Sequence, residues 1–586
     1  MSQSREDSGR PAPAAEETPA VPAASALDRR QFLGGMGLAV GAVVGGGGLA
    51  GLAAGEGTAE AAVEAPEDPI QRRNSAYQIR HQAALDAKAF GIPHHPTNGD
   101  EELYPTKIGN HTRTLPHNAL GEVDVDIYNQ LVAAIANNDL AATELIPKGG
   151  RLGYVNPLGG LAFNVYGSDS EAITMPPPPA IASREWAAQM AELYWMALLR
   201  DIPFTEYDGH PLVAQACADL SAFPGYTGPR DPVTGQVTPQ ILFRLAYGGV
   251  TDGPIVSQFL LQTYFYNGTF VNGRVLHQIP NQDYITYFPE WVDAQNGFAV
   301  FPAAPPSDLD PTPRYLHDAR GMGRNADGDF IHTAYTAVIL QAGALGMRSD
   351  PANPYVGSHR QGGFSTFGLA HVLSLVVGVI HSERQAWFHK WNVHRYLRPE
   401  EGAGLVHKVK AGLRDYPLHP DLIAHSSVLP LLFESNRQMN VKRLGIDAGS
   451  YMLPMIFRVG GPTFPSFPSG HATTAAACAT VLKAWFDEDQ PFPHPMVPTA
   501  DGLGLVPYTP PPGSPPLTIG GELNKLAHNY SLGRDMGGIH WRGDTEGGHV
   551  LGEELAIRFL REERPTYPEP FHGFTLTRFN GEKITI

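Results

Sequence analysis

Cysteine is almost absent from this sequence. The 586 residues include only Cys217 and Cys478, so a framework of several disulfides and a zinc site built from cysteine thiolates are both excluded. Positive charge is also scarce, because 42 lysines and arginines stand against 59 aspartates and glutamates, giving a formal net charge of −17. A nucleic-acid surface needs the opposite balance. Any anion site must therefore be a local basic cluster within an acidic protein.

Long uninterrupted apolar runs and internal repeats are missing as well. The most apolar helical stretch, within residues 367–391, is interrupted by charged residues before it is long enough to span a bilayer. We therefore expect no stable membrane span once the N-terminus is processed. The length allows one large domain or two to three ordinary ones.

The N-terminus has the features of a targeting segment. The sequence RRQFL at 29–33 precedes a glycine-rich, weakly apolar stretch, and Ala-Glu-Ala at 59–61 offers small residues around a cleavage point. This segment resembles a bacterial twin-arginine signal peptide, which exports folded proteins. An uncleaved anchor is the alternative, and the many glycines disfavour it. We expect residues 1–61 to be removed and the protein to be periplasmic or extracellular.

Helical periodicity is far more common here than strand-like alternation. It predicts helices within residues 72–90, 123–139, 183–204 and 367–391. The ten prolines of residues 491–516 predict a long surface loop. The sequence therefore predicts a mainly α protein whose core is built from helical bundles.

The unusual polar residues gather in the second part of the chain. We therefore divide it into an N-terminal helical and loop-rich half, 62–366, and a half that carries the candidate site, 367–586, with the proline-rich loop 491–516 inside it. In the first half, the segment Gly323–Phe330 places oxygen-bearing side chains at alternating positions. This is typical of a calcium loop and also of a polar turn. The polar turn is the preferred interpretation, and calcium stays an open alternative.

The first polar segment, HKWNVHRYLRPEE, contains Lys390 and Arg398. On a continuous helix these side chains would lie about 80° apart. Because Pro399 disfavours helical backbone at Arg398, we expect the helix to end and the chain to turn there. Two surface cations are the simpler explanation of this segment alone.

The second segment, Pro-Ser-Gly-His at 468–471, leads directly into an alanine-rich helical stretch. The first N–H groups of a helix have no partner within the helix, and the helix dipole adds positive potential there. With the Ser469 hydroxyl they make a cradle for an anion, and Gly470 leaves its approach free of a β-carbon. His471 lies in the first turn beside it. An ordinary capped helix is the alternative.

The third segment, SLGRDMGGIHWRGD, contributes Arg534, a bidentate donor to oxyanions, and His540. Asp544 follows His540 by four residues. Its carboxylate could keep one imidazole nitrogen protonated and leave the other as a nucleophile or ligand, and a purely structural His–Asp pair is the alternative. The three segments together would surround one tetrahedral oxyanion, phosphate or vanadate.

The order Lys-x7-Arg-Pro, Pro-Ser-Gly-His and Arg-x5-His-x3-Asp resembles the vanadium-dependent haloperoxidases and the acid and lipid phosphatases related to them. Seven residues separate Lys390 from Arg398, whereas the phosphatase pattern has six, and the long N-terminal half also favours the haloperoxidases. The resemblance covers residues 367–560 best. It implies the helical-bundle fold of vanadium haloperoxidases and type 2 phosphatidic acid phosphatases.

The resemblance also implies a role for each motif residue. One vanadate per subunit would be held by Lys390, Arg398, Ser469, Gly470, His471, Arg534 and His540. His540 would be the vanadium ligand, His471 the acid–base residue, and Lys390 the cation that polarises bound peroxide. Asp544 would support His540 from behind.

The activity implied is oxidation of bromide or iodide by hydrogen peroxide to hypohalous acid, which halogenates small organic acceptors. Relatives assemble as dimers or larger, so we expect a homo-oligomer. Trp387 and Phe464 are aromatic, as at the matching positions of fungal chloroperoxidases, and are candidates for the halide pocket. Bromide and iodide are the expected substrates, and chloride is left open.

Two other functions fit the same residues. A phosphatase of this fold would form a phosphohistidine at His540 and use His471 to protonate the leaving alcohol. An exported oxyanion-binding protein without catalytic activity would explain the cradle but would leave both histidines without a chemical task.

Overall fold

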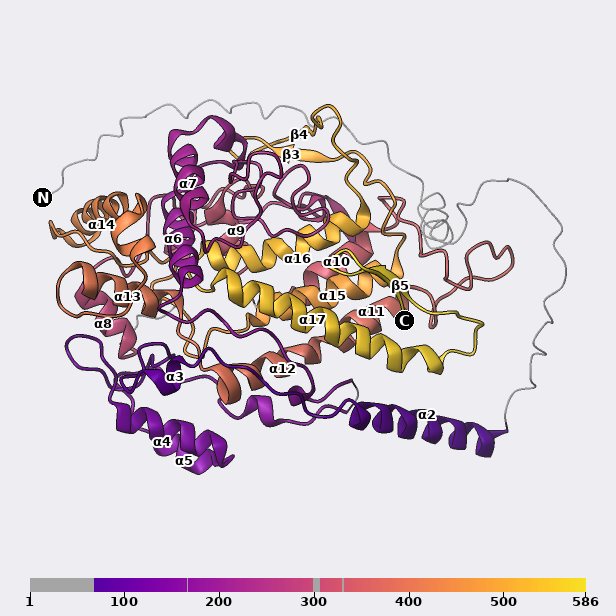
Figure 1. The fold of residues 1–586 in the computed structure, drawn as a ribbon. Coiled ribbons are helices and arrows are strands. Elements are labelled where there is room, and N and C mark those ends of the chain that lie inside the picture. The colour runs from indigo at the N-terminus through magenta and orange to yellow at the C-terminus, as the bar shows by residue number, and fades with distance from the viewer. Residues whose placement is uncertain (1–67, 166, 299–305, 329–330) are drawn as a thin grey trace, which may run out of the picture.

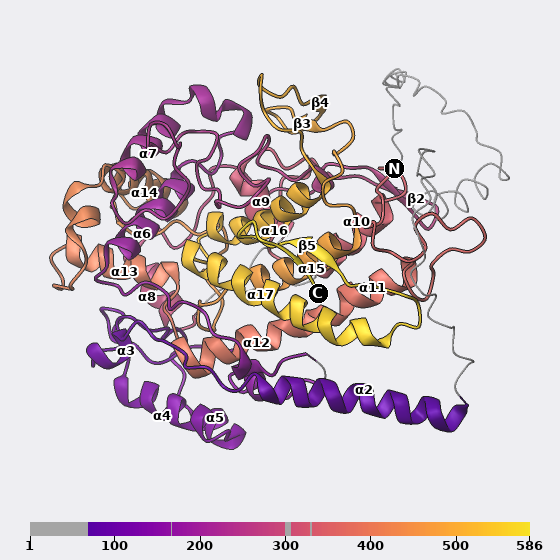
Figure 2. The same cartoon turned by 45° about the vertical axis from the view of Figure 1, so that its right-hand side comes forward.

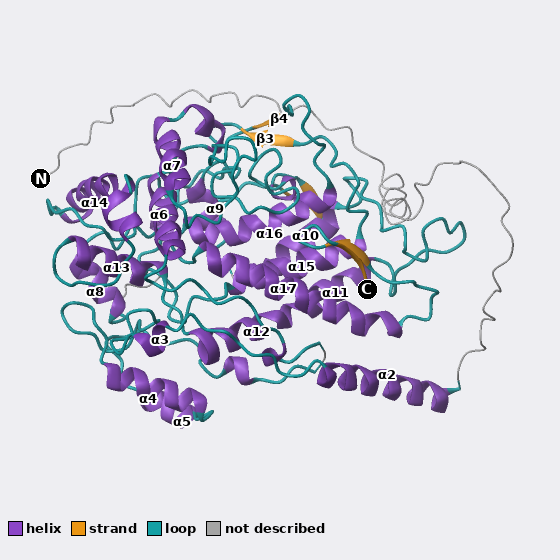
Figure 3. Ribbon diagram, in the orientation of Figure 1, coloured by secondary structure: helices purple, strands orange, loops and turns teal. Residues whose placement is uncertain are grey.

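Helices dominate the computed structural model, which describes residues 68–165, 167–298, 306–328 and 331–586 (Figures 1 and 3). Its α-helices are α2 (Pro69–Ala89), α3 (Asp100–Leu103), α4 (Val125–Ala136), α5 (Leu140–Leu145), α6 (Arg184–Leu198), α7 (Pro211–Ala222), α8 (Phe288–Gln295), α9 (Ala319–Asn325), α10 (Ile331–Gln341), α11 (Leu369–Gly378), α12 (Ser382–Phe388), α13 (Pro399–Lys410), α14 (Val428–Leu444), α15 (Gly470–Trp485), α16 (Ile519–Met536) and α17 (Arg542–Glu563). The mainly α prediction is confirmed. The expected signal peptide, residues 1–61, lies outside the described residues.

Strands are few and short in the described residues. They form three antiparallel pairs: β1 (Tyr264–Tyr266) with β2 (Thr269–Val271), β3 (Met496–Pro498) with β4 (Leu505–Pro507), and β5 (Thr575–Thr577) with β6 (Lys583–Thr585). The β3–β4 hairpin lies in the proline-rich segment 491–516, which was predicted as a loop throughout. The difference has a local cause: the Thr499 backbone N–H donates to the Gly504 carbonyl at 2.9 Å and closes the turn between the two strands.

The centre of the bundle is formed by α15, α16 and α17 (Figures 1 and 2). A β-carbon at Gly548 of α17 would lie 2.6 Å from the Ala472 β-carbon, and one at Gly552 only 2.1 Å from the Thr473 carbonyl oxygen. Non-bonded carbons prefer separations of about 3.5–4.0 Å, so these glycines allow α15 and α17 to pack backbone to backbone. The alanine-rich composition of α15 is explained in the same way, because nearly every residue of this helix is buried.

The stretch 367–391 was predicted as one long helix, and the structure divides it. α11 and α12 are joined by a 3₁₀ turn, Val379–His381, and α12 continues into a π-helical turn, His389–His394. Arg395 then takes a left-handed conformation, with φ of 41°, and ends the helical run. As a result Lys390 lies in the π-helical turn, whereas Arg398 is the extended residue that precedes α13.

Helix α6 shows how the two halves of the sequence share one core. Ser183 caps it by accepting a hydrogen bond from the Trp186 backbone N–H at 3.1 Å, and the helix is buried on nearly all sides rather than along one stripe. Trp186 packs against Trp541 with ring centroids 5.4 Å apart. The largest hydrophobic cluster draws residues from both sides of the 366/367 division, which itself stays a prediction. None of the helices in the described part of the chain is both long enough and apolar enough for a membrane span.

Candidate active site

His540 lies in the short connection between α16 and α17, just before the helix rather than on it. Its Nδ1 is 2.8 Å from Asp544 Oδ2, and the same carboxylate oxygen accepts the Trp541 backbone N–H at 3.1 Å. A carboxylate can only accept here, so Nδ1 carries the proton and Nε2 keeps its lone pair. The Asp544 carbonyl in turn accepts the Ser469 N–H at 2.9 Å. This bond joins the N-termini of α17 and α15.

Arg398 approaches His540 from the opposite side. One terminal nitrogen lies 3.3 Å from His540 Nε2 and 3.0 Å from the Ile539 carbonyl oxygen. Its Nε donates to the Phe464 carbonyl at 2.9 Å. The side chain is completely buried, so these bonds fix the guanidinium in one position.

Lys390 is also completely buried and lies against the loop before α15. Its ammonium donates to the carbonyl oxygens of Pro465, at 3.1 Å, and Ser466, at 2.7 Å. The Ser466 hydroxyl donates to Asp544 Oδ2 and lies 3.4 Å from His540 Nδ1. The loop therefore connects the lysine to the histidine–aspartate pair.

Helix α15 begins in the way its sequence predicts. Ser469 is the N-cap, and its hydroxyl accepts the Ala472 N–H at 3.3 Å. A β-carbon placed on Gly470 would meet the Glu383 carboxylate at 3.5 Å and the Trp387 ring at 3.9 Å. Gly470 therefore faces α12, and a β-carbon there would be in ordinary van der Waals contact with that helix.

Arg534 completes the set of cations from α16. It donates to Asp327 Oδ1 at 3.1 Å, and its Nε is buried with no hydrogen-bond partner in the described part of the chain. Asp327 belongs to the segment weighed as a calcium loop, and its other carboxylate oxygen lies 3.4 Å from Arg324. The calcium alternative stays untested, and Asp327 serves here as a partner of Arg534.

Burial and neighbouring positive charges lower the pKa values of the basic side chains in the site. Burial lowers the pKa of His471 and of His540 well below the usual value, and repulsion from Arg398, Lys390 and Arg534 lowers both further. Burial and the Arg398 charge likewise hold the pKa of Lys390 well below its usual range. Both histidines are therefore neutral near pH 7, and a bound anion would favour the charged form of Lys390.

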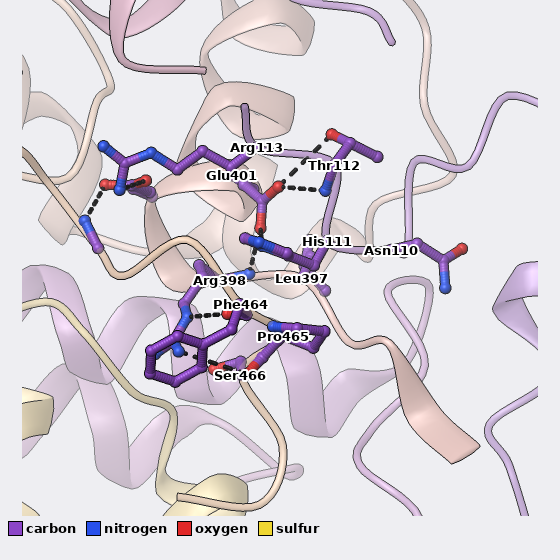
Figure 4. Close-up of polar contacts among 12 residues, drawn as sticks. Asn110, His111, Thr112, Arg113, Leu397, Arg398, Glu401, Phe464, Pro465 and Ser466 are labelled. Carbon is purple, nitrogen blue, oxygen red and sulfur yellow. Dashed lines mark hydrogen bonds and ion pairs between the residues drawn. The ribbon is translucent and has the colours of Figure 1, made fainter. Parts of the chain in front are cut away.

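A second layer of contacts holds Arg398 in place (Figure 4). Glu401 accepts the Arg398 backbone N–H at 2.7 Å and lies 2.9 Å from His111 Nδ1, and its other oxygen accepts the Thr112 N–H at 2.8 Å. Residues 111–112 belong to the N-terminal half of the sequence. That half therefore positions a cation of the candidate site.

The two predicted halide-pocket residues meet beside the cations. Trp387 and Phe464 have ring centroids 4.6 Å apart. The Phe464 ring centre lies 4.6 Å from the Arg398 guanidinium carbon and 5.3 Å from the Lys390 ammonium. A halide-binding role stays a prediction, but the Phe464 ring borders two of the cations and the Trp387 ring packs against it.

These residues fit a tetrahedral oxyanion. Lys390, Arg398 and Arg534 are all buried, and an anion bound beside them would offset the cost of burying their positive charges. The two carbonyl contacts of Lys390 use two of its three N–H donors, and Arg534 Nε is unused. Phosphate and vanadate both match this set of donors, and His540 Nε2, which faces Arg398 at 3.3 Å, carries the lone pair that a vanadium ligand needs.

Two residues of the site were missed from the sequence. Ser466 bonds to Asp544, and it lies in the first Pro-Ser of the repeated FPSFPS sequence, which was a usable signal. Asp327 pairs with Arg534; the segment Gly323–Phe330 was noted as a calcium loop or a polar turn, but nothing in it pointed to a partner on α16.

Known proteins resemble this chain over nearly its whole length. A family model described as the VCPO second helical-bundle domain matches residues 446–564. A vanadium-dependent bromoperoxidase of Ascophyllum nodosum is 35% identical over 539 residues, which are 89% of this chain and 93% of that protein. The vanadium-dependent bromoperoxidase of Corallina officinalis is 31% identical and covers 89% of this chain and 100% of its own length.

A solved structure agrees with these relatives. The homohexameric second vanadate-dependent bromoperoxidase of Ascophyllum nodosum superposes with a TM-score of 0.82 at 31% identity, over 92% of this chain and 94% of that one. The residues matched by the family model include Ser469, Arg534 and His540. The chain therefore belongs to the vanadium-dependent haloperoxidase family.

Proposed function

We propose that this protein is an exported, vanadate-dependent haloperoxidase that oxidises bromide and iodide with hydrogen peroxide to hypohalous acid. One observation carries the proposal: His540 Nδ1 lies 2.8 Å from Asp544 while Nε2 faces the buried Arg398 at 3.3 Å. A histidine fixed in this tautomer beside buried cations suits a ligand to an anionic metal centre. Its relatives are vanadium-dependent bromoperoxidases, which supports the same assignment.

The residues that would hold vanadate divide by task. His540 Nε2 would bind the vanadium, and Lys390, Arg398 and Arg534 would neutralise its oxygens. Ser469 and the Gly470 N–H would donate from the helix N-terminus. Bound vanadate would supply a Lewis acid for activating peroxide.

His471 would move protons at the site. Its pKa is lowered by burial and by the nearby cations, so the neutral ring can accept a proton when peroxide enters. A bound anion opposes the repulsion from the cations and raises the pKa, which allows the ring to return that proton. Lys390 would polarise bound peroxide toward halide.

We further propose that Trp387 and Phe464 border the halide. Two aromatic faces beside Arg398 and Lys390 give a site that is both positively charged and poorly hydrated, which favours a weakly hydrated anion. Bromide and iodide meet this description better than chloride. The hypohalous acid formed would halogenate small organic acceptors.

The cellular and quaternary setting is proposed on separate grounds. The paired arginines at 29–30 and the small residues at 59–61 support export by the twin-arginine route. A relative with a TM-score of 0.82 is homohexameric, which supports homo-oligomerisation here.

The deciding experiment is bromination of monochlorodimedone with bromide and peroxide, with and without added orthovanadate, together with elemental analysis. We expect activity only with vanadate and one vanadium per chain. Hydrolysis of a phosphate ester without any vanadate-dependent bromination would instead identify a phosphatase with a phosphohistidine at His540.

The remaining alternative, an oxyanion-binding protein without catalysis, is tested by His540→Ala. A simple binding protein would retain vanadate through its cations. The proposed enzyme should lose both tight vanadium retention and turnover, while the circular dichroism spectrum is unchanged.

A further inference from the structure

A second cluster of potential metal ligands lies apart from the residues of the proposed active site. His277, His317 and Asp318 each present one ligand atom, and these atoms all lie within 4.8 Å of one another. His277 and Asp318 are buried, and His317 is partly buried. The two imidazole rings stack with centroids 5.0 Å apart. The proposed haloperoxidase chemistry uses none of these side chains.

The spacing within the cluster is unlike that of direct hydrogen bonds. His277 Nδ1 lies 3.6 Å from Asp318 Oδ1, and His317 Nε2 lies 3.5 Å from Asp318 Oδ2. Hydrogen bonds between such atoms measure about 2.7–3.2 Å. Ligands bound about 2.0–2.2 Å from a tetrahedral zinc ion lie about 3.3–3.6 Å from one another. Each nitrogen–oxygen separation therefore falls in the range for two ligands of one ion, with each imidazole facing a different oxygen of the Asp318 carboxylate.

The surrounding contacts orient two of the ligands. His317 Nδ1 lies 3.1 Å from the Tyr315 carbonyl oxygen, which can only accept, so Nε2 keeps a lone pair directed at the cluster. Asp318 Oδ1 accepts the Gly321 N–H at 2.7 Å, which fixes the carboxylate. Such contacts behind the ligands are regular features of metal sites.

His277 is held by close packing and is not fully satisfied by the protein. A β-carbon on Gly321 would lie 2.2 Å from His277 Cε1, so the imidazole rests directly on the backbone of α9. Its Nε2 is buried and has no hydrogen-bond partner in the part of the chain that the structure describes. The nitrogen that faces Asp318 is Nδ1, so this packing holds the potential ligand atom in place.

A cavity provides access to the cluster. Its volume is about 440 Å³, and its lining includes His317 together with Leu316 and Tyr207. His317 therefore borders a space from which an ion could approach the cluster, and water would supply the fourth ligand of a tetrahedral ion.

We propose that His277, His317 and Asp318 bind a divalent transition-metal ion of the zinc class. Two imidazoles with one carboxylate suit zinc and its neighbours, whereas calcium and magnesium prefer oxygen ligands throughout. The ion would tie residues 275–278 to the start of α9. Because α9 leads into Asp327, the partner of Arg534, the site would brace one border of the proposed vanadate site.

The test uses the full-length protein loaded with vanadate, so that the active-site histidines are engaged. Zn²⁺ is added, excess is removed by dialysis, and zinc and vanadium are measured in the same sample. We expect one retained zinc per chain in the wild type. His317→Gln and Asp318→Asn should each weaken zinc binding by at least about tenfold. His359→Gln, at an exposed histidine, is the matched control and should retain the wild-type value.

Co²⁺ gives a second readout, because a four-coordinate ion has intense d–d absorption that the two ligand variants should lack. Asp318→Asn keeps a side-chain oxygen for the Gly321 N–H, so it tests the ligand without removing the helix cap. A wild type that retains neither ion, or ligand variants that retain zinc as the wild type does, would overturn the proposal. The vanadium content reports separately on the proposed haloperoxidase function.

Discussion

At the scale of single residues, the carboxylate of Asp544 controls the tautomer of His540. It accepts from His540 Nδ1, from the Trp541 N–H and from Ser466, and burial raises its pKa to about 6. Asp544→Asn keeps an oxygen for the helix N-terminus but removes the charge that holds the imidazole. We expect vanadate to bind about 10–100-fold more weakly, as measured by equilibrium dialysis.

The matched control for Asp544→Asn is Glu546→Gln, which removes a carboxylate from the same helix without a contact to His540. It should bind vanadate as the wild type does. Equal affinity in both variants would show that the His540–Asp544 pair is only structural.

Phe464 is the second residue whose role can be isolated. Its ring lies over Arg398 and Lys390 and against Trp387. Phe464→His places a titratable group there, and we expect the bromide-to-chloride ratio of kcat/KM to change by about tenfold, equivalent to about 1.4 kcal/mol, or the pH optimum to move. Steady-state bromination and chlorination assays measure both.

Phe464→Leu separates loss of the aromatic ring from gain of an imidazole. If neither variant alters halide preference or pH optimum, Phe464 serves only for packing and the proposed halide pocket lies elsewhere.

The sequence predicted which side chains would gather but not how the backbone would hold them. Lys390, Arg398 and His540 could be identified because residue type and motif order point to an oxyanion. The hydrogen bonds from Lys390 and Arg398 to the carbonyl oxygens of residues 464–466 could not be predicted, because the direction of a carbonyl group depends on the path of the loop. Asp327 was missed for a related reason, since its partner is far away in the sequence.

At the scale of helices, the contact between α15 and α17 positions two parts of the site at once. Gly552→Ala would place a carbon 2.1 Å from the Thr473 carbonyl oxygen and force the helices apart. We expect a loss of about 1–3 kcal/mol in the free energy of unfolding, measured by denaturant titration, together with weaker vanadate binding.

Val550→Ala on the exposed side of α17 is the control for this packing effect. It should change the free energy of unfolding by less than about 0.5 kcal/mol. A Gly552→Ala protein of wild-type stability would mean that the two helices separate without cost.

The π-helical turn His389–His394 makes a prediction about pH. Burial is the main cause that lowers the pKa of His389 from 6.5 to about 3. The native state therefore keeps this ring neutral, whereas the unfolded chain takes up a proton as the pH falls below 6.5. The contribution of His389 to stability is complete above pH 6.5 and is lost progressively between pH 6.5 and about 3.

His389→Gln removes this titration. Between pH 6 and 4, the vanadate-free wild type should lose about 1.4 kcal/mol per pH unit relative to the variant, as urea unfolding at each pH would measure. A difference that does not change with pH would show that the ring is accessible to protons in the native state.

At the scale of the whole molecule, the helical class and the helices 183–204 and 123–139 were predictable from apolar periodicity and appear as α6 and α4, although α6 is buried on nearly all sides. The division of residues 367–391 into separate helical segments could not be predicted, because 3₁₀ and π-helical turns are selected by tertiary contacts rather than by local propensity. The β3–β4 hairpin was hidden by its prolines, which occupy positions at the strand ends.

One helix stands outside this shared core. None of the 21 residues of α2 is buried, and it extends along the edge of the molecule (Figures 1 and 2). A helix that buries little apolar surface gains little stability from tertiary packing. In a single subunit, its backbone amides should therefore exchange with deuterium within seconds, while those of α15 remain protected. Hydrogen–deuterium exchange of the protein in solution, followed by mass spectrometry, tests this. Slow exchange along α2 would indicate that a neighbouring subunit covers the helix.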